Sequence, residues 1–282
     1  MRAPAKNQFT HSHVVGGDGP VAFECSSDIA KWPWLALHPF DPIVVQTINY
    51  WASVETGEAR GTFDPTKWSA LVQTEWECGA DSAGHAVRGV SDVVGTEAEP
   101  RFELKFYDAS DALVYRMSGK GVVFQNRDFE GWRAKAKQKI TEPMDAADFD
   151  YAPCASVGVA TQKESFVSPL INGAAPSAHA LITASNGFIP DHPYHSGSGD
   201  HVNANHLADI GNQFAHLVTG WPALTITSGE ISFNRYVELG QIFTVNLIEH
   251  DTEGETVAME VHQADRLCSQ IKLTYRIGEQ SG

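Results

Sequence analysis

The sequence predicts an α+β protein made of two similar halves, each with one long helix followed by antiparallel strands. Two observations lead to this prediction. Apolar residues fall at helical spacing between Val202 and Thr219, and strand-like runs separated by short turns follow them. Matching short segments also recur in the two halves at a nearly constant separation. A helix followed by a strand meander lets the sheet bury one face on that helix.

Composition limits the possible functions. The chain has 282 residues, enough for two small domains, and 42% of them are hydrophobic, enough for a real core. The net charge of −15 argues against nucleic acid as a partner. The four cysteines form no CxxC pair, which argues against a zinc ribbon or a redox motif. No secretory signal and no apolar run of 18 residues is present, so we expect a cytoplasmic protein without a membrane segment.

The repeated segments predict a duplication. Their separations are 192 − 38 = 154, 223 − 70 = 153 and 267 − 113 = 154. The matching pairs are His38-Pro39-Phe40 with His192-Pro193-Tyr194, Ala70-Leu71 with Ala223-Leu224, and Leu113 with Leu267. We therefore expect residues 20–125 and 177–276 to be two copies of one fold. The boundary is placed near Asp145, which gives an N-terminal module of residues 1–144 and a C-terminal module of residues 145–282.

The first module is predicted to contain a helix over Ile43–Val54, with Pro42 at a position that suits the first helical residue. The strands expected after it are Leu71–Glu77, Ala86–Val94, Arg101–Tyr107 and Leu113–Phe124. A further helix is expected over Arg127–Ile140, with one apolar face and its lysines in solvent.

The segment from Thr141 to Ser177 contains prolines at 143, 153, 169 and 176 and many small residues. We interpret it as a linker that crosses the outside of the assembly, because a connection of this length is otherwise uncommon. Two short strands are possible within it, over Ser156–Thr161 and Ser165–Ile171.

The second module contains a run of glycines and titratable residues from Tyr194 to Asp200, which cannot be a regular helix. The helix to Thr219 follows and ends at Gly220. The strands expected after it are Leu224–Phe233, Ile242–Glu249, Thr256–His262 and Ser269–Tyr275, with turns over 251–254 and 263–266.

The last hundred residues resemble the thioesterase branch of the hotdog fold. The resemblance lies in His201-Val202-Asn203 entering a helix, Ile231-Ser232-Phe233 ending a strand, and Glu238-Leu239-Gly240. It implies a double hotdog, two antiparallel sheets each wrapped around a long central helix. It also implies hydrolysis of an acyl-CoA or acyl-carrier-protein thioester at the seam between modules, without a cofactor. Two positions depart from the thioesterase patterns, because Gly197 and Asn212 stand where acidic residues are expected.

Asp200 is the first candidate for the chemistry, as a base or nucleophile, although a helix N-cap is an equal interpretation. Asn203 can hold a water or the thioester oxygen, or simply cap the helix. His206 can act as acid or base, or be a satisfied interface histidine. His38 of the first module is the fourth catalytic candidate. The expected substrate-binding residues are Tyr194, His195, His201, Asn49 and Asn212. We expect a tunnel between the two helices, with the amides of the second helix facing the thioester oxygen.

Other functions stay open. Ser198-Gly199-Asp200 followed by Asn203 and His206 resembles the signature of enoyl-thioester hydratases, and the His38 loop resembles that of β-hydroxyacyl dehydratases. Together they suggest hydration or dehydration by His38 and Asp200. A non-catalytic acyl-binding module is a third possibility, and an exposed sheet edge can allow a homodimer. The histidine-rich loop holds zinc ligand types, but its spacing fits no standard site, so no metal is expected.

Overall fold

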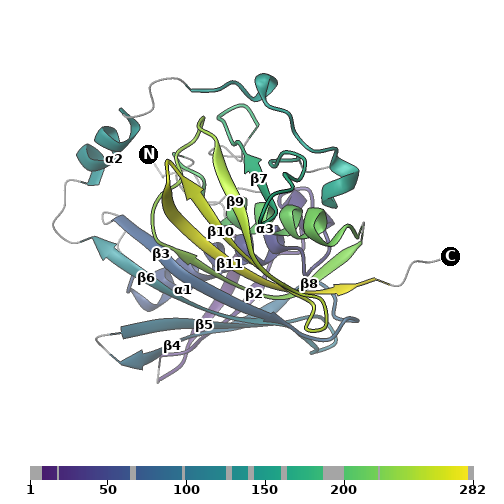
Figure 1. Cartoon of the computed structure of the whole chain (residues 1–282). Coiled ribbons are helices and arrows are strands. Elements are labelled where there is room, and N and C mark those ends of the chain that lie inside the picture. Colours follow the sequence, from purple (N-terminus) through teal and green to yellow (C-terminus); the bar gives the residue numbers. More distant parts are fainter. Residues whose placement is uncertain are drawn as a thin grey trace.

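The computed structural model describes residues 8–17, 19–63, 68–96, 99–124, 129–138, 143–159, 164–186, 200–221 and 223–278. The described residues form three α-helices and one large curved sheet, whose arrangement can be followed in Figure 1. The helices are α1 (Pro42–Arg60), α2 (Phe129–Lys137) and α3 (Ala204–Thr219), with short 3-10 turns η1 (Pro33–Ala36), η2 (Ala146–Asp148) and η3 (Cys154–Val157). The strands are β1 (Thr10–Val15), β2 (Val21–Cys25), β3 (Trp68–Cys78), β4 (Arg88–Thr96), β5 (Glu99–Tyr107), β6 (Leu113–Phe124), β7 (Ser177–Ala180), β8 (Leu224–Phe233), β9 (Phe243–Asp251), β10 (Thr256–Gln263) and β11 (Arg266–Ile277).

The sheet has the strand order β1-β2-β4-β5-β6-β3-β8-β11-β10-β9-β7. Each half contains a strand, a helix and four more strands, and the order β2-β4-β5-β6-β3 matches β7-β9-β10-β11-β8. The predicted α+β double hotdog fold is therefore confirmed. The expectation of two separate sheets needs correction, because β3 pairs with β8 and joins them into one. The boundary between residues 144 and 145 stays a prediction.

The β3–β8 contact is a short antiparallel ladder from Gln73–Ser232 to Glu77–Ser228. At its centre Trp76 lies opposite Gly229, and the indole covers the glycine. A Cβ atom at Gly229 would meet Trp76 ring atoms at 2.2 Å and 2.4 Å, so no larger residue fits there without moving the ring. The two halves thus meet at a point where only glycine allows close approach.

Both long helices start and stop through recognisable caps. Asp41 caps α1 by accepting from the Ile43 amide at 3.0 Å, and Pro42 occupies the first helical position as predicted. Gly61 and Gly220 end α1 and α3 in the left-handed region, with φ of 72° and 70°. The helix α1 is longer than predicted because its last turns carry buried polar residues, whose pattern does not look apolar.

The buried Glu55 shows how such a residue is accommodated. Its carboxylate accepts hydrogen bonds from the amides of Phe9 and Thr10 at 2.9 and 2.6 Å and from the Thr10 hydroxyl. Burial raises the pKa of Glu55, although the hydrogen bonds from Thr10 and Phe9 act in the opposite direction. The side chain thereby ties β1 to α1 across 45 residues.

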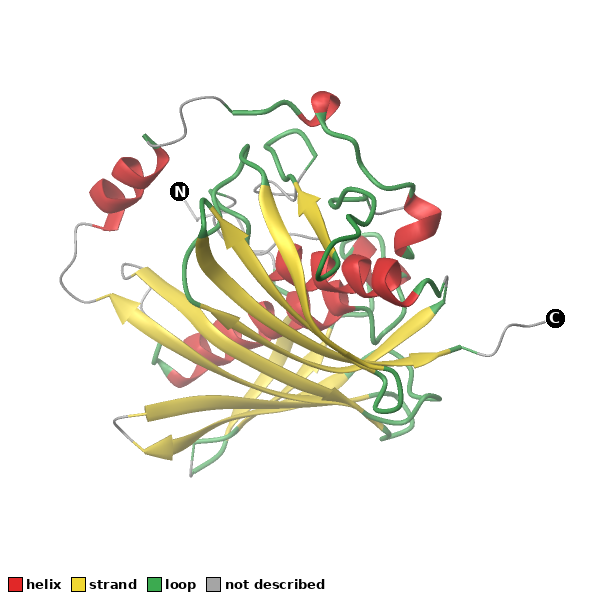
Figure 2. Ribbon diagram, in the orientation of Figure 1, coloured by secondary structure: helices red, strands yellow, loops and turns green. Residues whose placement is uncertain are grey.

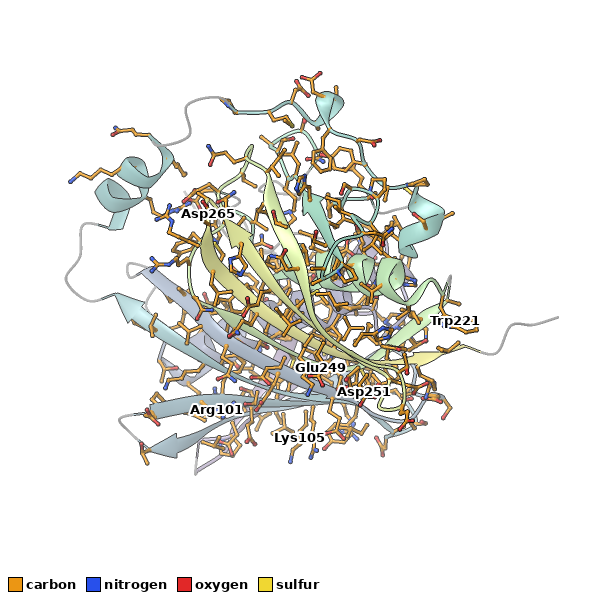
Figure 3. The ribbon with its side chains drawn as sticks, viewed as in Figure 1. Arg101, Lys105, Trp221, Glu249, Asp251 and Asp265 are labelled. Atoms are coloured by element: carbon orange, nitrogen blue, oxygen red, sulfur yellow. The ribbon has the colours of Figure 1, made fainter. Side chains whose placement is uncertain are left out.

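The helices α1 and α3 lie on one side of the sheet (Figure 2). The strands alternate accordingly: in β5, Leu104 and Phe106 are fully buried and Lys105 between them is exposed. Charged side chains such as Lys105 and Glu249 lie over the strands (Figure 3), and both are exposed. No described helix is long and apolar enough to be a candidate membrane span.

The described parts of the linker, 143–159 and 164–177, contain two short 3-10 turns and no compact helical domain, as predicted. The prediction of two short strands inside the linker is wrong. Residues 154–157 form η3, and the later segment makes only isolated bridges, Val167 with Ala180 and Ile171 with Ser177. The linker packs on α3, since a Cβ atom at Gly158 would overlap the His216 ring.

The repeat is confirmed for the strands, and the matching motif before α3 lies outside the described residues. The first residues of β3 and β8 are 224 − 68 = 156 apart, and those of β6 and β11 are 266 − 113 = 153 apart. The N-caps Asp41 and Asn203 are 162 apart. His38 is three residues before its cap, whereas His192 is eleven before Asn203 and lies outside the described residues. The match between His38 and His192 stays a prediction.

We predict that Gly229→Ala destabilises the protein by about 1–3 kcal/mol, because the new methyl group must displace the Trp76 indole from the junction of the halves. Thermal unfolding measures the effect. Gly121→Ala in β6 is the matched control, since the nearest atom to its Cβ would be the Ala70 oxygen at 3.5 Å. Equal melting temperatures for the two variants would contradict this account of the junction.

Candidate active site

The site lies where α1 and α3 pack side by side. Val202, just before α3, pairs with Val237 beyond the end of β8. His38, just before α1, interacts electrostatically with Arg276, which pairs with Thr225 at the start of β8. The helices therefore begin at opposite ends of β8 and run antiparallel. A hydrogen bond joins the two helices, in which Asn205 Nδ2 donates to Thr47 Oγ1 at 2.7 Å.

The helix α3 has a buried polar face turned away from the sheet. Gly211 faces the sheet, because a Cβ atom there would contact Ile271 and Leu273 of β11. Asp209 and Gln213 lie two residues to either side of it, about 160° around the helix. Both have no solvent-exposed surface, and His206 is 1% exposed. Polar groups buried this completely need partners, and the linker supplies some of them.

Gln213 connects Asp209 to the linker backbone. Its Nε2 donates to Asp209 Oδ2 at 3.0 Å and to the Glu164 carbonyl oxygen at 2.8 Å. Its Oε1 accepts from the Phe166 amide at 2.8 Å. The amide orientation is thus fixed from three sides, and the Asp209 carboxylate is held in one position.

His206 belongs to the cap of α3. Its Nδ1 accepts from the Asn203 amide at 3.2 Å, so neutral His206 carries its proton on Nε2. The Asn203 side chain in turn accepts from the amides of Asn205 and His206 at 3.0 and 3.3 Å. The capping alternative for Asn203 is confirmed. Because the cap occupies these amides, they are not available to a thioester oxygen as the sequence analysis expected.

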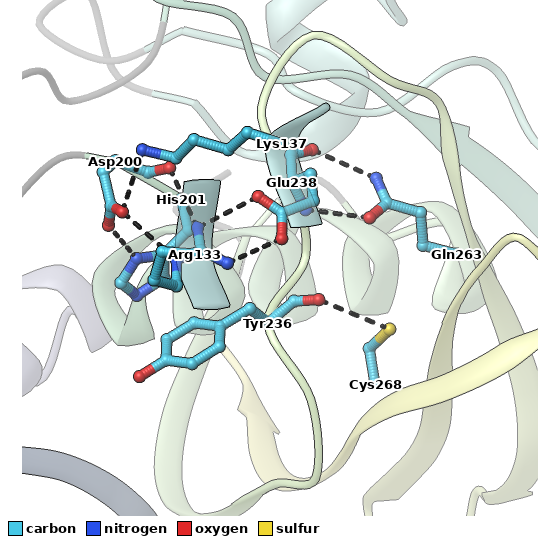
Figure 4. Close-up of polar contacts among 8 residues, drawn as sticks. All are labelled: Arg133, Lys137, Asp200, His201, Tyr236, Glu238, Gln263 and Cys268. Atoms are coloured by element: carbon cyan, nitrogen blue, oxygen red, sulfur yellow. Dashed lines mark hydrogen bonds and ion pairs between the residues drawn. The ribbon is translucent and has the colours of Figure 1, made fainter. Parts of the chain in front are cut away.

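Asp200 lies three residues before the N-cap, so the N-cap interpretation of this residue is wrong. Its carboxylate contacts three side chains (Figure 4). Oδ2 is 3.2 Å from Arg133 Nε and 3.0 Å from Lys137 Nζ, and Oδ1 bonds to His201 Nδ1. The side chain is 28% exposed. Asp200 therefore contacts α2 and His201, and the buried face of α3 carries a different carboxylate.

Arg133 is the centre of this ion cluster, with a side chain only 4% exposed. It donates to both carboxylate oxygens of Glu238 at 2.6 and 3.0 Å and stacks over the Tyr236 ring at 4.5 Å. Burial lowers the pKa of Arg133, but the hydrogen bonds and charges of Glu238 and Asp200 raise it overall. His201 packs edge-on against the same Tyr236 ring at 4.4 Å. Together these contacts fasten α2 to the chain before α3.

The structure does not bring His38 together with Asp200. His38 is exposed, and its Nδ1 accepts from the Phe40 amide at 3.2 Å. Partial burial lowers the pKa of His38, while Asp41 raises it. His38 lies near the start of β8 and Asp200 near its end. The strand from Thr225 to Phe233 is about 26 Å long at the usual rise per residue, and this length separates the two side chains. The proposed His38–Asp200 acid–base pair is therefore wrong.

Asn49 faces the sheet, where its Nδ2 is 3.4 Å from Thr74 Oγ1 and its Oδ1 accepts from Ser53 at 3.2 Å. Asn212 lies on α3 and is 7% exposed. Tyr194 and His195 fall outside the described residues. Within the described ranges, no group of three His, Cys, Asp or Glu residues could hold a metal ion.

A hollow of about 550 Å³ lies near β1 and β2 and not at the helix seam. Its lining residues are His11, Glu24, Cys25, Ser26, Ser27, Asp28, Val87 and Arg88. The tunnel between the helices stays a prediction.

Sequence reasoning did not single out Arg133 and Gln213, and it named Asp209 only as a carboxylate available besides Asp200. Asp209 and Gln213 are four apart and so share a helix face, a visible signal. Arg133 is four residues after Phe129 and so lies on the apolar face predicted for that helix.

Several solved structures are similar in fold. An acyl-ACP thioesterase from Bacteroides thetaiotaomicron matches with a TM-score of 0.54 and 12% identity, over 92% of this chain and 97% of that one. The 12:0-ACP thioesterase of Umbellularia californica gives 0.53 and 10%, over 91% and 96%. A dehydratase domain of the curacin polyketide synthase gives 0.51 and 13%, over 95% and 96%. No protein-family model matches the sequence, and no curated protein matches it. At these identities the likeness concerns the fold.

We predict that Arg133→Met destabilises the protein by about 3 kcal/mol, because Asp200 and Glu238 lose their shared cation in a mostly buried place. Limited proteolysis should also cut near α2 sooner. Lys135→Ala, at an exposed position of the same helix, is the control and should change neither property. If Arg133→Met melts and digests like the wild type, the cluster does not hold α2.

Proposed function

We propose that this protein hydrolyses acyl thioesters of coenzyme A or acyl carrier protein at the α1–α3 seam. The supporting observation is the fully buried carboxylate of Asp209, oriented by Gln213 and one helical turn from His206. A buried carboxylate in a fixed orientation suits a general base. The fold agrees with this proposal, since structures described as acyl-ACP thioesterases share it.

The reaction needs a base, a proton donor and a thioester. Asp209 takes a proton from water as the water oxygen attacks the thioester carbonyl carbon. When the tetrahedral intermediate collapses, the C–S bond breaks and the departing sulfur takes from Asp209 the proton that Asp209 had taken from water. The products are a carboxylic acid and a free thiol. The tautomer imposed on His206 by the Asn203 amide gives this side chain an Nε2–H that can donate a hydrogen bond to the reacting group, without transfer of the proton.

Asp209 replaces Asp200 as the preferred base for a geometric reason. The carboxylate oxygens of Asp200 already accept from Arg133, Lys137 and His201. Asp200 then acts as a positioning residue, which fixes the chain before Asn203 and so fixes the start of α3. A cytoplasmic location and a homodimer through the edge strands β1 or β7 remain part of the proposal.

Hydration or dehydration of an enoyl or β-hydroxyacyl thioester is the second candidate. It is favoured by one observation, a histidine and a carboxylate three residues apart on one helix, which is an acid–base pair for the C2–C3 bond. A dehydratase domain with the same fold agrees with it.

The test uses the purified full chain with a series of acyl-CoA substrates and crotonyl-CoA. Release of free thiol reports hydrolysis, and loss of enoyl absorbance reports hydration. We expect thiol release in the wild type and a fall in kcat of about 10²–10⁴-fold in Asp209→Asn, as expected when a general base is lost.

Asp200→Asn is the matched comparison, the same chemical change nine residues earlier on the chain. We expect a loss of less than about tenfold, because a positioning residue acts indirectly. Melting temperatures of both variants show that each is folded. The opposite ranking would return the base to Asp200, hydration without thiol release would select the second function, and acyl binding without turnover would indicate a non-catalytic module.

A further inference from the structure

The side chain of Gln46 in α1 is buried without partners. It is 2% exposed, and neither its Nε2 nor its Oε1 has a hydrogen-bond partner. Three buried tryptophans also have an unpaired nitrogen, but each leaves one polar atom unmatched inside a large apolar ring. Gln46 leaves a donor and an acceptor unmatched in a short chain. Native proteins rarely retain such a group without a reason.

The repeat shows which way Gln46 faces. The left-handed caps Gly61 and Gly220 end α1 and α3, and 220 − 61 = 159. The same offset relates Ala52, which is fully buried, to Gly211, which faces the sheet. It makes Gln46 the counterpart of Asn205 (46 + 159) and Thr47 the counterpart of His206 (47 + 159).

Asn205 reaches across the seam to Thr47. The halves are arranged around the central β3–β8 pair with reversed strand order, so a contact across the seam has a counterpart on the other side of the axis. The counterpart of Asn205 facing Thr47 is Gln46 facing His206. The unpaired carboxamide is thus directed at the first turn of α3, next to the turn that carries Asp209.

We propose that Gln46 is a catalytic residue of the first module, whose Nε2–H donates to the carbonyl oxygen of the thioester. This inference rests on the proposed hydrolysis. The negative charge that develops on this oxygen needs preorganised donors, and the amides of Asn205 and His206 in the first turn of α3 are already bound by Asn203. Gln46 supplies a donor with no competing partner, and its Oε1 can accept from the attacking water. The bound substrate completes the hydrogen bonds that the side chain lacks.

Gln46→Leu tests the role, because it keeps the approximate volume and removes the unpaired amide. We expect kcat for acyl-CoA hydrolysis to fall about 10²–10³-fold, as for loss of one oxyanion donor. The melting temperature should stay the same or rise, since an unsatisfied buried group is removed. Thr56→Val is the control on the same helix. It loses the hydroxyl bonds to Ala52 and Ser91, so it should melt lower while kcat is unchanged.

A binding measurement separates this inference from the hydrolysis itself. Two unreactive acyl-CoA analogues are compared by calorimetry: a ketone with a methylene between sulfur and carbonyl, and a thioether without the carbonyl. The wild type should prefer the ketone about tenfold or more, consistent with one hydrogen bond to a buried donor. Gln46→Leu should bind both equally. The comparison needs no turnover, so it applies even if the wild type hydrolyses nothing.

The inference fails if Gln46→Leu keeps the wild-type kcat while Asp209→Asn loses it, because hydrolysis would then proceed without the Gln46 amide. It also fails if the wild type binds the two analogues equally, or if Gln46→Leu keeps the preference for the ketone. Absence of thiol release from the wild type overturns the proposed hydrolysis alone.

Discussion

The whole architecture depends on the backbone pairing between β3 and β8. A half sheet with one helix has two open edges, and its helix has a second side that the sheet cannot cover. Pairing β3 with β8 removes one edge from each half and brings α1 beside α3, where each helix covers part of the other. The glycine opposite Trp76 makes this pairing close enough for a continuous ladder. Everything at the helix seam inherits its geometry from this junction.

The linker has a second structural task besides connecting the halves. The face of α3 away from the sheet carries an aspartate, a glutamine and a histidine, and solvent does not reach them. Backbone groups at Glu164 and Phe166 bind the glutamine, so an irregular segment provides the polar partners that a regular strand, with its groups used in a ladder, would not offer. This explains why Ser165, Phe166 and Val167 are buried although this part of the linker has no regular structure.

The sequence was most informative for helices and strands that have one buried and one exposed face, because their apolar residues recur at a regular spacing. The limits of β6 and β8 follow from alternation and turns, and the start of α3 follows from Asn203 and its apolar spacing. The short strands β1, β2 and β7 were missed. The pairings that place β2 and β7 in the sheet, such as Ala22 with Val90 and Ala178 with Val245, join residues far apart in the chain. The ion cluster could not be foreseen either: Arg133 and Asp200 are 67 residues apart, and nothing local marks them as partners. The many polar residues around Asp200 in the sequence attracted attention to it, whereas Asp209 stands in an apolar helical pattern and was considered only as a second carboxylate.

Joining the two halves in one chain has a consequence for evolution. In a homodimer every substitution appears on both sides of the symmetry axis, so a residue that suits one side must also be tolerated on the other. In this chain the counterpart of Asp209 is Tyr50 (50 + 159), which is 38% exposed, and the counterpart of Asn205 is Gln46. Each helix has thus been free to specialise. A fused protein cannot form two identical sites across its axis, and in return its two helices can evolve as different surfaces that face each other.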